Sequence, residues 1–277
     1  MQDHRHLQRP FSKTVRIMSP SLSVDDLTSI AEARKQRPRW HRWSDETRPA
    51  DLEAGYWLQQ QVHAALENAG VHRVGYKIAS IAVEGQRALG LTEPAYAGIY
   101  DLTQMPNLRE ALALPFVAPS LECEIAFVIG QELNGESDLS DNGLRAAIGS
   151  AHLACEVVDN RYGKPLEIGV PTILTDDFFH SAFILAPAQP GWQELLRRDV
   201  AGTIEIDGKV WPGSTAEVMP PFETLRWLVQ KLGSHGLTLA AGEIVLAGSL
   251  VKPTPVSLPA TSVTIAAEGF GALTLAD

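Results

Sequence analysis

Two glutamates lie two residues apart in an otherwise apolar segment, LECEIAFVIG, at residues 121–130. The segment alternates and is rich in β-branched and aromatic side chains, which predicts a strand that enters a protein core. Side chains of a strand alternate between its faces, so Glu122 and Glu124 share one face, about 6.8 Å apart at Cα. Carboxylates at that spacing can converge on one point, where a proton, a cationic side chain or a divalent cation must neutralise them.

A divalent cation neutralises such a pair best, because carboxylate oxygens are hard ligands that suit Mg²⁺ or Mn²⁺. The alternative is that both glutamates face solvent from an edge strand, and spacing alone favours that alternative. A third carboxylate shifts the balance. Glu156 lies in ACEVVDNRY, among small and apolar residues, which is not an ordinary surface position, and Asp159 and Arg161 follow it.

The composition excludes several classes of protein. The chain has 277 residues, of which 45% are hydrophobic and 20% charged, enough for one large domain or two small ones. A net charge of −10 argues against nucleic acid and anionic membranes as partners. No apolar run approaches the roughly 20 residues of a membrane helix. Only two cysteines are present, Cys123 and Cys155, which fits a reducing cytoplasm rather than a disulfide framework.

Four segments have features typical of helices. Residues 21–37 open with Ser23 and Asp26 at roughly the spacing of a capping box. Residues 49–70 and 220–236 carry apolar side chains at helical intervals and reach a glycine at their ends. The fourth segment begins at residue 141, and its apolar face predicts a helix that ends near Glu156; that face consists of Leu144, Ile148, Ala151 and Cys155.

The remaining periodic segments predict strands. VGYKIAS reads as a short strand that carries Lys77, and residues 97–129 look mostly extended. TIEIDGKVWPG alternates around Asp207-Gly208, a strong hairpin signal. We therefore expect an α+β fold. Residues 1–20 are expected to form a disordered arm and residues 21–277 a single domain, with a small helical part over 21–72 and a mainly β body over 73–277.

Five phrases, in this order, resemble the 2-keto-4-pentenoate hydratase and 4-oxalocrotonate decarboxylase family of the fumarylacetoacetate hydrolase superfamily. They are GYKIAS, PSLECEIAFVIG, ACEVVDNRY, TDDFFHSAFIL and GLTLAAGEIVLAGSLVKPTPV. The resemblance runs from about Pro49 to the C-terminus. It implies a rolled mixed sheet like that of the fumarylacetoacetate hydrolase C-terminal domain, which agrees with the α+β prediction.

The resemblance also implies a metal site and a catalytic lysine. The family's E-x-E pair and the glutamate of its E-[IV]-[IV]-D-x-R phrase hold one Mg²⁺ or Mn²⁺; these positions are Glu122, Glu124 and Glu156 here. Lys77 matches the lysine of a G-[WY]-K-[IV]-G phrase, an acid/base or a partner of substrate charge. A lysine at the core-side end of an apolar strand can have a lowered pKa and act near neutral pH. The alternative is a lysine that extends to solvent.

Three further residues are expected to contact the substrate. Arg161 would grip a carboxylate or tie down Glu156, two roles that the sequence does not separate. Asp159 would lie beside the metal ligands rather than bind the metal. Ser249, in LAGSLVKP, matches a family position near the substrate, and the alternative is an ordinary turn serine.

The chain also departs from the family pattern. Ala95 and Tyr96 stand where many hydratases carry an aspartate proposed as a second acid/base. Asp177 replaces an asparagine and Phe179 a serine of the usual A-D-N-x-S phrase. The metal ligands are kept while the pocket is changed, which suggests a shifted substrate. His180 is a candidate for the missing acid/base, and a packed or exposed histidine is the alternative.

The resemblance implies a lyase. Its substrate would be a small 2-oxo or 2-hydroxy-dienoic acid that chelates the cation through its carboxylate and C2 oxygen, and is hydrated or decarboxylated through a metal-stabilised enolate. One alternative is a hydrolase of acylpyruvate C–C bonds, although no clear His–Glu pair precedes Glu122. The other is a non-catalytic partner of an active paralogue. A homo-oligomer in a catabolic pathway for aromatic compounds, associating with a paralogous enzyme, fits the same family.

Overall fold

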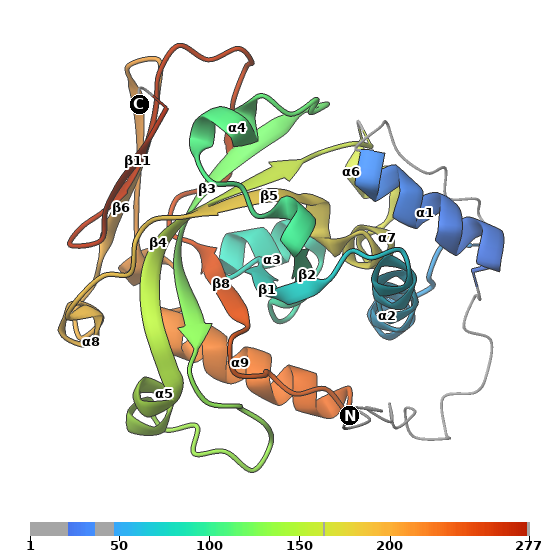
Figure 1. Cartoon of the computed structure of the whole chain (residues 1–277), viewed down its shortest axis with the longest axis horizontal. Coiled ribbons are helices and arrows are strands. Elements are labelled where there is room, and N and C mark those ends of the chain that lie inside the picture. The colour runs from blue at the N-terminus through green and yellow to red at the C-terminus, as the bar shows by residue number, and fades with distance from the viewer. Residues whose placement is uncertain (1–21, 37–46, 163, 276–277) are drawn as a thin grey trace.

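The computed structural model describes residues 22–36, 47–162 and 164–275, and contains two β-sheets with helices packed around them (Figure 1). The large sheet has the order β2-β1-β8-β3-β4-β5, with β9 beside β3. Its strands are β1 (Arg73–Ala79), β2 (Ala95–Tyr100), β3 (Pro119–Ile129), β4 (Ile148–Asp159), β5 (His180–Leu185), β8 (Ile244–Ser249) and β9 (Thr254–Pro255). The expectation for residues 1–20 lies outside the described residues.

The small sheet has the order β11-β10-β6-β7 and follows from the second half of the sequence. Its strands are β6 (Ala201–Ile206), β7 (Lys209–Ser214), β10 (Val263–Ala267) and β11 (Gly271–Thr274). The predicted hairpin is confirmed, because β6 and β7 pair antiparallel around Asp207 and Gly208, whose φ angles of 49° and 80° suit a tight hairpin turn.

The helices lie around the sheets, α9 along the large sheet and α1 and α2 at one side (Figure 1). They are α1 (Val24–Gln36), α2 (Leu52–Asn68), α3 (Val83–Leu89), α4 (Leu108–Leu112), α5 (Asp141–Ala147), α6 (Pro165–Ile168), α7 (Val170–Thr175), α8 (Trp192–Leu195) and α9 (Pro221–Ser234), with short 3₁₀ turns at Asp101–Thr103, Asp177–Phe179 and Thr215–Glu217. No helix among the described residues is both long and apolar enough to span a membrane.

The large sheet is mixed and rolls up on itself. β1 and β8 are parallel, while the other neighbours are antiparallel. Just after β2, Gln104 forms a bridge with Phe183 of β5, so the two ends of the strand order meet. The rolled mixed sheet expected from the sequence is therefore confirmed. Side chains from almost every strand meet on its inner face in one apolar cluster: Ile99, Ala126, Ala154, Phe183, Ile244 and Leu246.

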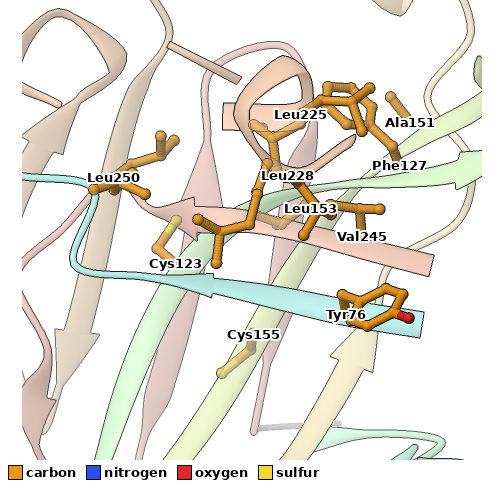
Figure 2. Close-up of a cluster of buried hydrophobic side chains, with 14 of the residues drawn as sticks. Tyr76, Cys123, Phe127, Ala151, Leu153, Cys155, Leu225, Leu228, Val245 and Leu250 are labelled. Carbon is orange, nitrogen blue, oxygen red and sulfur yellow. The ribbon is translucent and has the colours of Figure 1, made fainter. Parts of the chain in front are cut away.

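The outer face of the large sheet forms the main core with α9 (Figure 2). The apolar face predicted for residues 121–129 faces this core, and Phe127 stacks on Phe222 of α9 with ring centroids 5.8 Å apart. Leu225 and Leu228 of the same helix are fully buried there. On this strand, alternation therefore sends the apolar side chains outward to α9 and the two glutamates inward.

The predicted helix starts are confirmed for the N-terminal helices. The backbone N–H of Asp26 donates to Ser23 Oγ at 3.1 Å, and that of Ser23 donates back to Asp26 Oδ2 at 3.1 Å, which is a capping box. Asp51 caps α2 by accepting from the N–H of Ala54 at 2.9 Å. These helices share an apolar cluster that includes Ile30 and Val62.

The helix predicted to run to Glu156 is wrong in its length. α5 ends at Ala147, and residues 148–159 form β4, which pairs with β3 along its whole length. Residues 148–159 form a strand because its alternate side chains reach the main core; these are Ala151, Leu153, Cys155 and Val157. A short helix, α4, also interrupts the region expected to be mostly extended, and Asn107 caps it by accepting from the N–H of Glu110.

Candidate active site

Three carboxylates converge on the inner face of the rolled sheet. Glu122 of β3 lies directly opposite Glu156 of β4 in the antiparallel register, and Glu124 is the next inward residue of β3. Each offers an oxygen, and these atoms all lie within 4.8 Å of one another. β3 runs between β8 and β4, so the edge-strand alternative is wrong. Glu124 and Glu156 are completely buried, whereas Glu122 is partly exposed.

The carboxylates of this triad, as we call Glu122, Glu124 and Glu156, have fewer partners than buried acids require. Glu124 Oε2 accepts from the N–H of Gly248 at 2.7 Å, but Glu124 Oε1 has no hydrogen-bond partner in the described chain. Glu156 Oε2 is equally without a partner there. A buried acceptor without a donor costs free energy, which a bound cation would offset. Three oxygen donors in this arrangement fit Mg²⁺ or Mn²⁺.

The pKa values of the triad show the same deficit of positive charge. Burial, helped by repulsion from Glu156, raises the pKa of Glu122 to about 7. Burial and the other two glutamates also raise the pKa of Glu124 well above its usual value. Burial acts on Glu156 in the same direction, but Lys77 and His180 outweigh it and lower its pKa to about 2. The negative charge of Glu156 is therefore balanced by Lys77 and His180, whereas the charges of Glu122 and Glu124 are not balanced in this way.

Among the described residues, Lys77 is a cation in direct contact with the triad. Its side chain comes from β1, is almost fully buried, and places Nζ 3.1 Å from Glu156 Oε1 and 3.2 Å from the carbonyl oxygen of Phe178. The alternative of a lysine that extends to solvent is wrong. The lowered pKa expected from the sequence is also wrong: burial lowers the pKa of Lys77, but the carboxylates of the triad raise it by more. Lys77 therefore carries a proton within reach of the site.

His180 also meets the triad, which the sequence left open. Its Nδ1 lies 2.9 Å from Glu156 Oε1 and its Nε2 lies 2.8 Å from the hydroxyl of Thr103. Burial lowers the pKa of His180 more than Glu156 raises it, so the ring is neutral near pH 7. A neutral ring meets Glu156 through Nδ1–H, and Nε2 then faces the Thr103 hydroxyl, whose single proton also lies within reach of the Tyr100 carbonyl oxygen at 2.8 Å. Sequence reasoning missed Thr103, which has no signal beyond its hydroxyl.

Asp159 and Ser249 are bonded to the backbone near the triad. Asp159 Oδ1 accepts from the N–H groups of Val117 and Ala118 at 2.9 and 2.7 Å, which fixes the approach to β3. Ser249 Oγ accepts from the N–H of Cys123 at 3.1 Å and donates to the carbonyl of Val251 at 2.6 Å. Both arrangements position β3, and their contacts with a substrate stay predictions.

Arg161 lies in the wall of a pocket next to the triad. Arg161 Nη2 donates to Asp176 Oδ2 at 2.5 Å and Nη1 donates to Ser181 Oγ at 3.2 Å, so these bonds do not tie down Glu156. The pocket extends from His180 toward α1, and Arg161, Asp159, Arg34 and several apolar side chains line it. His180 thus faces both the pocket and the triad, and a role for Arg161 in gripping substrate stays a prediction.

No family model matches the chain. A Pseudomonas putida protein described as "TodF product hydratase" is 30% identical over 211 residues, which cover 75% of this chain and 77% of that protein. A 2-keto-4-pentenoate hydratase of Paraburkholderia phymatum is 26% identical over 264 residues, covering 92% and 98%. The structure of 4-oxalocrotonate decarboxylase from Pseudomonas putida G7, complexed with magnesium and adipate, superposes with a TM-score of 0.78 over 92% of this chain and 98% of that chain, at 21% identity.

Proposed function

Since the chain belongs to the family of 2-keto-4-pentenoate hydratases and 4-oxalocrotonate decarboxylases, we propose that it is a divalent-metal-dependent lyase of small 2-oxo or 2-hydroxy-dienoic acids. The observation that carries this proposal is the triad: three inward carboxylates, two of them with buried oxygens that no described group satisfies, beside a buried lysine. Mg²⁺ or Mn²⁺ is the cation that such oxygens favour.

Glu122, Glu124 and Glu156 would hold the cation, with Gly248 and His180 fixing the orientation of two of them. When bound, the cation would supply a positive charge for the C1 carboxylate and C2 oxygen of the substrate. It would also offset the repulsion between an anionic substrate and a chain of net charge −10. The apolar cluster behind the triad excludes water from that side of the site.

Lys77 is the group of this chain best placed to move a proton. Its ammonium is held between Glu156 and the Phe178 carbonyl, and ionised neighbours keep it protonated. A cation bound to the same carboxylates would weaken their hold on the lysine proton, because it competes for their negative charge. We infer that Lys77 donates a proton to the substrate carbon chain or takes one from it.

The remaining features rest on the resemblance and on composition. The free cysteines Cys123 and Cys155 lie directly opposite each other on β3 and β4, which supports a reducing cytoplasm. A homo-oligomer, an association with a paralogous enzyme, and substrate contacts of Arg161, Asp159 and Ser249 belong to this proposal too. The choice between hydration and decarboxylation is decided by whether a dienoic acid gains water or a 2-oxo diacid releases CO₂.

Hydrogen exchange at C3 of a simple 2-oxo acid tests the proposal without knowledge of the natural substrate. 2-Oxopentanoate incubated in D₂O with protein and Mg²⁺ should take up deuterium next to its carbonyl, as followed by proton NMR, and EDTA should stop the uptake. Lys77→Ala should lower the rate by about 10²–10⁴-fold, the usual worth of a positioned proton donor or acceptor. Its Mg²⁺ affinity, measured by calorimetry, should stay close to that of the unmodified protein.

Lys209→Ala is the matched control, because Lys209 is an exposed lysine on β7 of the other sheet. It should exchange at the unmodified rate. If a panel of 2-oxo acids of different chain lengths shows no exchange above a blank that contains only metal, the lyase assignment is wrong. If Lys77→Ala exchanges normally, the proton is moved by another group.

A further inference from the structure

Three consecutive residues between α7 and β5 have an unusual backbone. Asp177, Phe178 and Phe179 have φ angles of 50°, 47° and 65°, in the left-handed region that residues other than glycine rarely adopt. A run of such residues persists only where the surrounding structure holds it in place. The sequence identified Asp177 and Phe179 as departures from the family phrase but gave no reason for them.

This left-handed turn delivers two groups to the triad. The carbonyl oxygen of Phe178 accepts from Lys77 Nζ at 3.2 Å. His180, the next residue after the turn, places Nδ1 2.9 Å from Glu156 Oε1. The positions of Lys77 and His180 against Glu156 therefore depend on the same three residues of backbone.

The Asp177 carboxylate is what fastens the turn to the rest of the protein. It is fully buried and accepts hydrogen bonds from donors on three elements. On β2, the N–H of Gly98 and the hydroxyl of Tyr100 each donate at 2.8 Å. On α2, His63 Nε2 lies 2.8 Å away, and on α1 Arg34 forms a short ion pair with the same carboxylate.

The neighbouring Asp176 extends this attachment without reaching the triad. Its two oxygens accept from Arg34 at 3.0 Å and from Arg161 at 2.5 Å. Arg34 thus bridges both aspartates and brings α1 against the turn. Arg161 also donates to Ser181 Oγ at 3.2 Å, beside His180, whereas Lys77 is held through the Phe178 carbonyl of the turn.

We propose that Asp177 is a positioning residue for the reaction: its carboxylate, held by Arg34, His63, Gly98 and Tyr100, fixes the left-handed turn that sets Lys77 and His180 against Glu156. The proposal rests on the proposed function of the triad. An asparagine at this position would present an NH₂ group to donors that need an acceptor. The turn would then lose part of its support, and Lys77 would lose its fixed place.

Asp177→Asn tests the proposal, with C3 exchange of 2-oxopentanoate as the readout. We expect kcat to fall by about 10–100-fold, the usual effect of losing a group that orients an active-site residue. KM should change little, and the Mg²⁺ affinity should fall by less than kcat, because Asp177 reaches the triad only through Lys77 and through His180, which orients one ligand. Glu93→Gln is the matched control: Glu93 also pairs with a lysine, Lys231, and with Trp227, but has no contact with the turn.

A second arm separates positioning from a merely structural role. If Asp177 acts through Lys77, adding Asp177→Asn to Lys77→Ala should lower the exchange rate far less than it does in the unmodified protein, since groups that act as one unit are not additive. An equal loss in both backgrounds, or an unchanged kcat in Asp177→Asn, would overturn the proposal. If Asp177→Asn does not fold, Tyr100→Phe removes one donor at almost constant volume and should lower kcat alone.

A crystal structure of Asp177→Asn decides the matter even if the unmodified protein shows no exchange and the proposed function fails. The proposal predicts that residues 177–179 leave the left-handed region and that Lys77 Nζ no longer reaches the Phe178 carbonyl. A turn and a Lys77 contact that both survive the substitution would contradict it.

Discussion

Two acidic clusters are linked in the structure through the left-handed turn, yet they differ in how their charge is balanced. In the pair Asp176 and Asp177, all four carboxylate oxygens have described partners, among them Arg34 and Arg161. In the triad, one oxygen of Glu124 and one of Glu156 have none within the described chain. The charge of the aspartate pair is balanced by described residues, whereas the triad needs a positive charge or donors that the described residues do not supply.

The pKa values express this difference. Burial raises the pKa of Asp177, but His63 and Arg34 outweigh it and hold the value far below the usual range. For Glu122 and Glu124, burial and repulsion from Glu156 outweigh the attraction of Lys77, and both pKa values rise. Burial is common to both clusters, so the supply of donors decides which cluster is structural and which is open to a cation.

The largest effect should come from removing the triad's charge. A Glu122→Gln, Glu124→Gln, Glu156→Gln variant should lose Mn²⁺ binding, as measured by calorimetry on the metal-free protein. Glu124→Gln alone should weaken binding by more than the roughly 10–100-fold that orienting groups contribute, because it removes a ligand. Asp177→Asn should weaken Mn²⁺ binding much less than Glu124→Gln, because it keeps all three ligands and disturbs only the orientation of Glu156 by His180. Unchanged Mn²⁺ binding by the triple variant would contradict the metal site proposed at the triad.

Stability should respond in the opposite order. Asp177→Asn should destabilise the fold by about 3–5 kcal/mol, because it breaks the ion pair between the buried Asp177 carboxylate and the partly buried Arg34. Glu124→Gln in EDTA should cost less than about 1 kcal/mol or stabilise the protein, since it relieves repulsion between buried carboxylates. Urea unfolding in EDTA measures both. A larger loss for Glu124→Gln would reverse the comparison.

The smallest expected effect is that the stability which Mg²⁺ adds to the fold depends on pH. The folded protein holds the Glu122 proton up to about pH 7, above the usual pKa of 4.5, so it binds more protons than the unfolded chain between these values. The free energy of unfolding in EDTA should therefore fall as the pH rises through this window. The lowered pKa values of Glu156 and Asp177 act only below their ordinary values of 4.5 and 3.8, where their stabilisation is lost as the pH falls.

Mg²⁺ binds the ionised carboxylates of the triad, so it should offset the loss of folding stability that is expected at higher pH. The gap in Tm between Mg²⁺ and EDTA should be wider at pH 8 than at pH 5.5, as measured by calorimetry. An equal gap, or a wider one at pH 5.5, would show that the raised pKa values do not belong to the cation site.

The sequence was sufficient to predict the part of the candidate site that lies on a single strand. Alternation placed Glu122 and Glu124 together on one face, and the apolar surroundings of Glu156 marked it as unusual. The boundary between α5 and β4 was not predictable in this way, because Ile148, Ala151 and Cys155 fit a helical face as well as a strand. Pairing with β3 and burial against α9 decide it, and neither is local.

The parts of the site that escaped prediction depend on distant contacts. His180 reaches Glu156 where the register of β4 and β5 shifts by a bulge at Val157 and Val158, which no local pattern announces. The partners of Asp177 come from α1, α2 and β2, more than 70 residues away in the sequence. Residue types suggested chemistry at these positions, but only the folded chain shows which groups meet.

A crystal structure with Mn²⁺ and oxalate, a small stand-in for the 2-oxo acid, tests the central claim most directly. The account predicts one anomalous peak for manganese between Glu122, Glu124 and Glu156, with oxygens of all three as ligands, oxalate on its open side, and Lys77 still buried beside it. No peak at the triad under saturating Mn²⁺, or a triad closed by the Lys77 ammonium with manganese bound elsewhere, would contradict it.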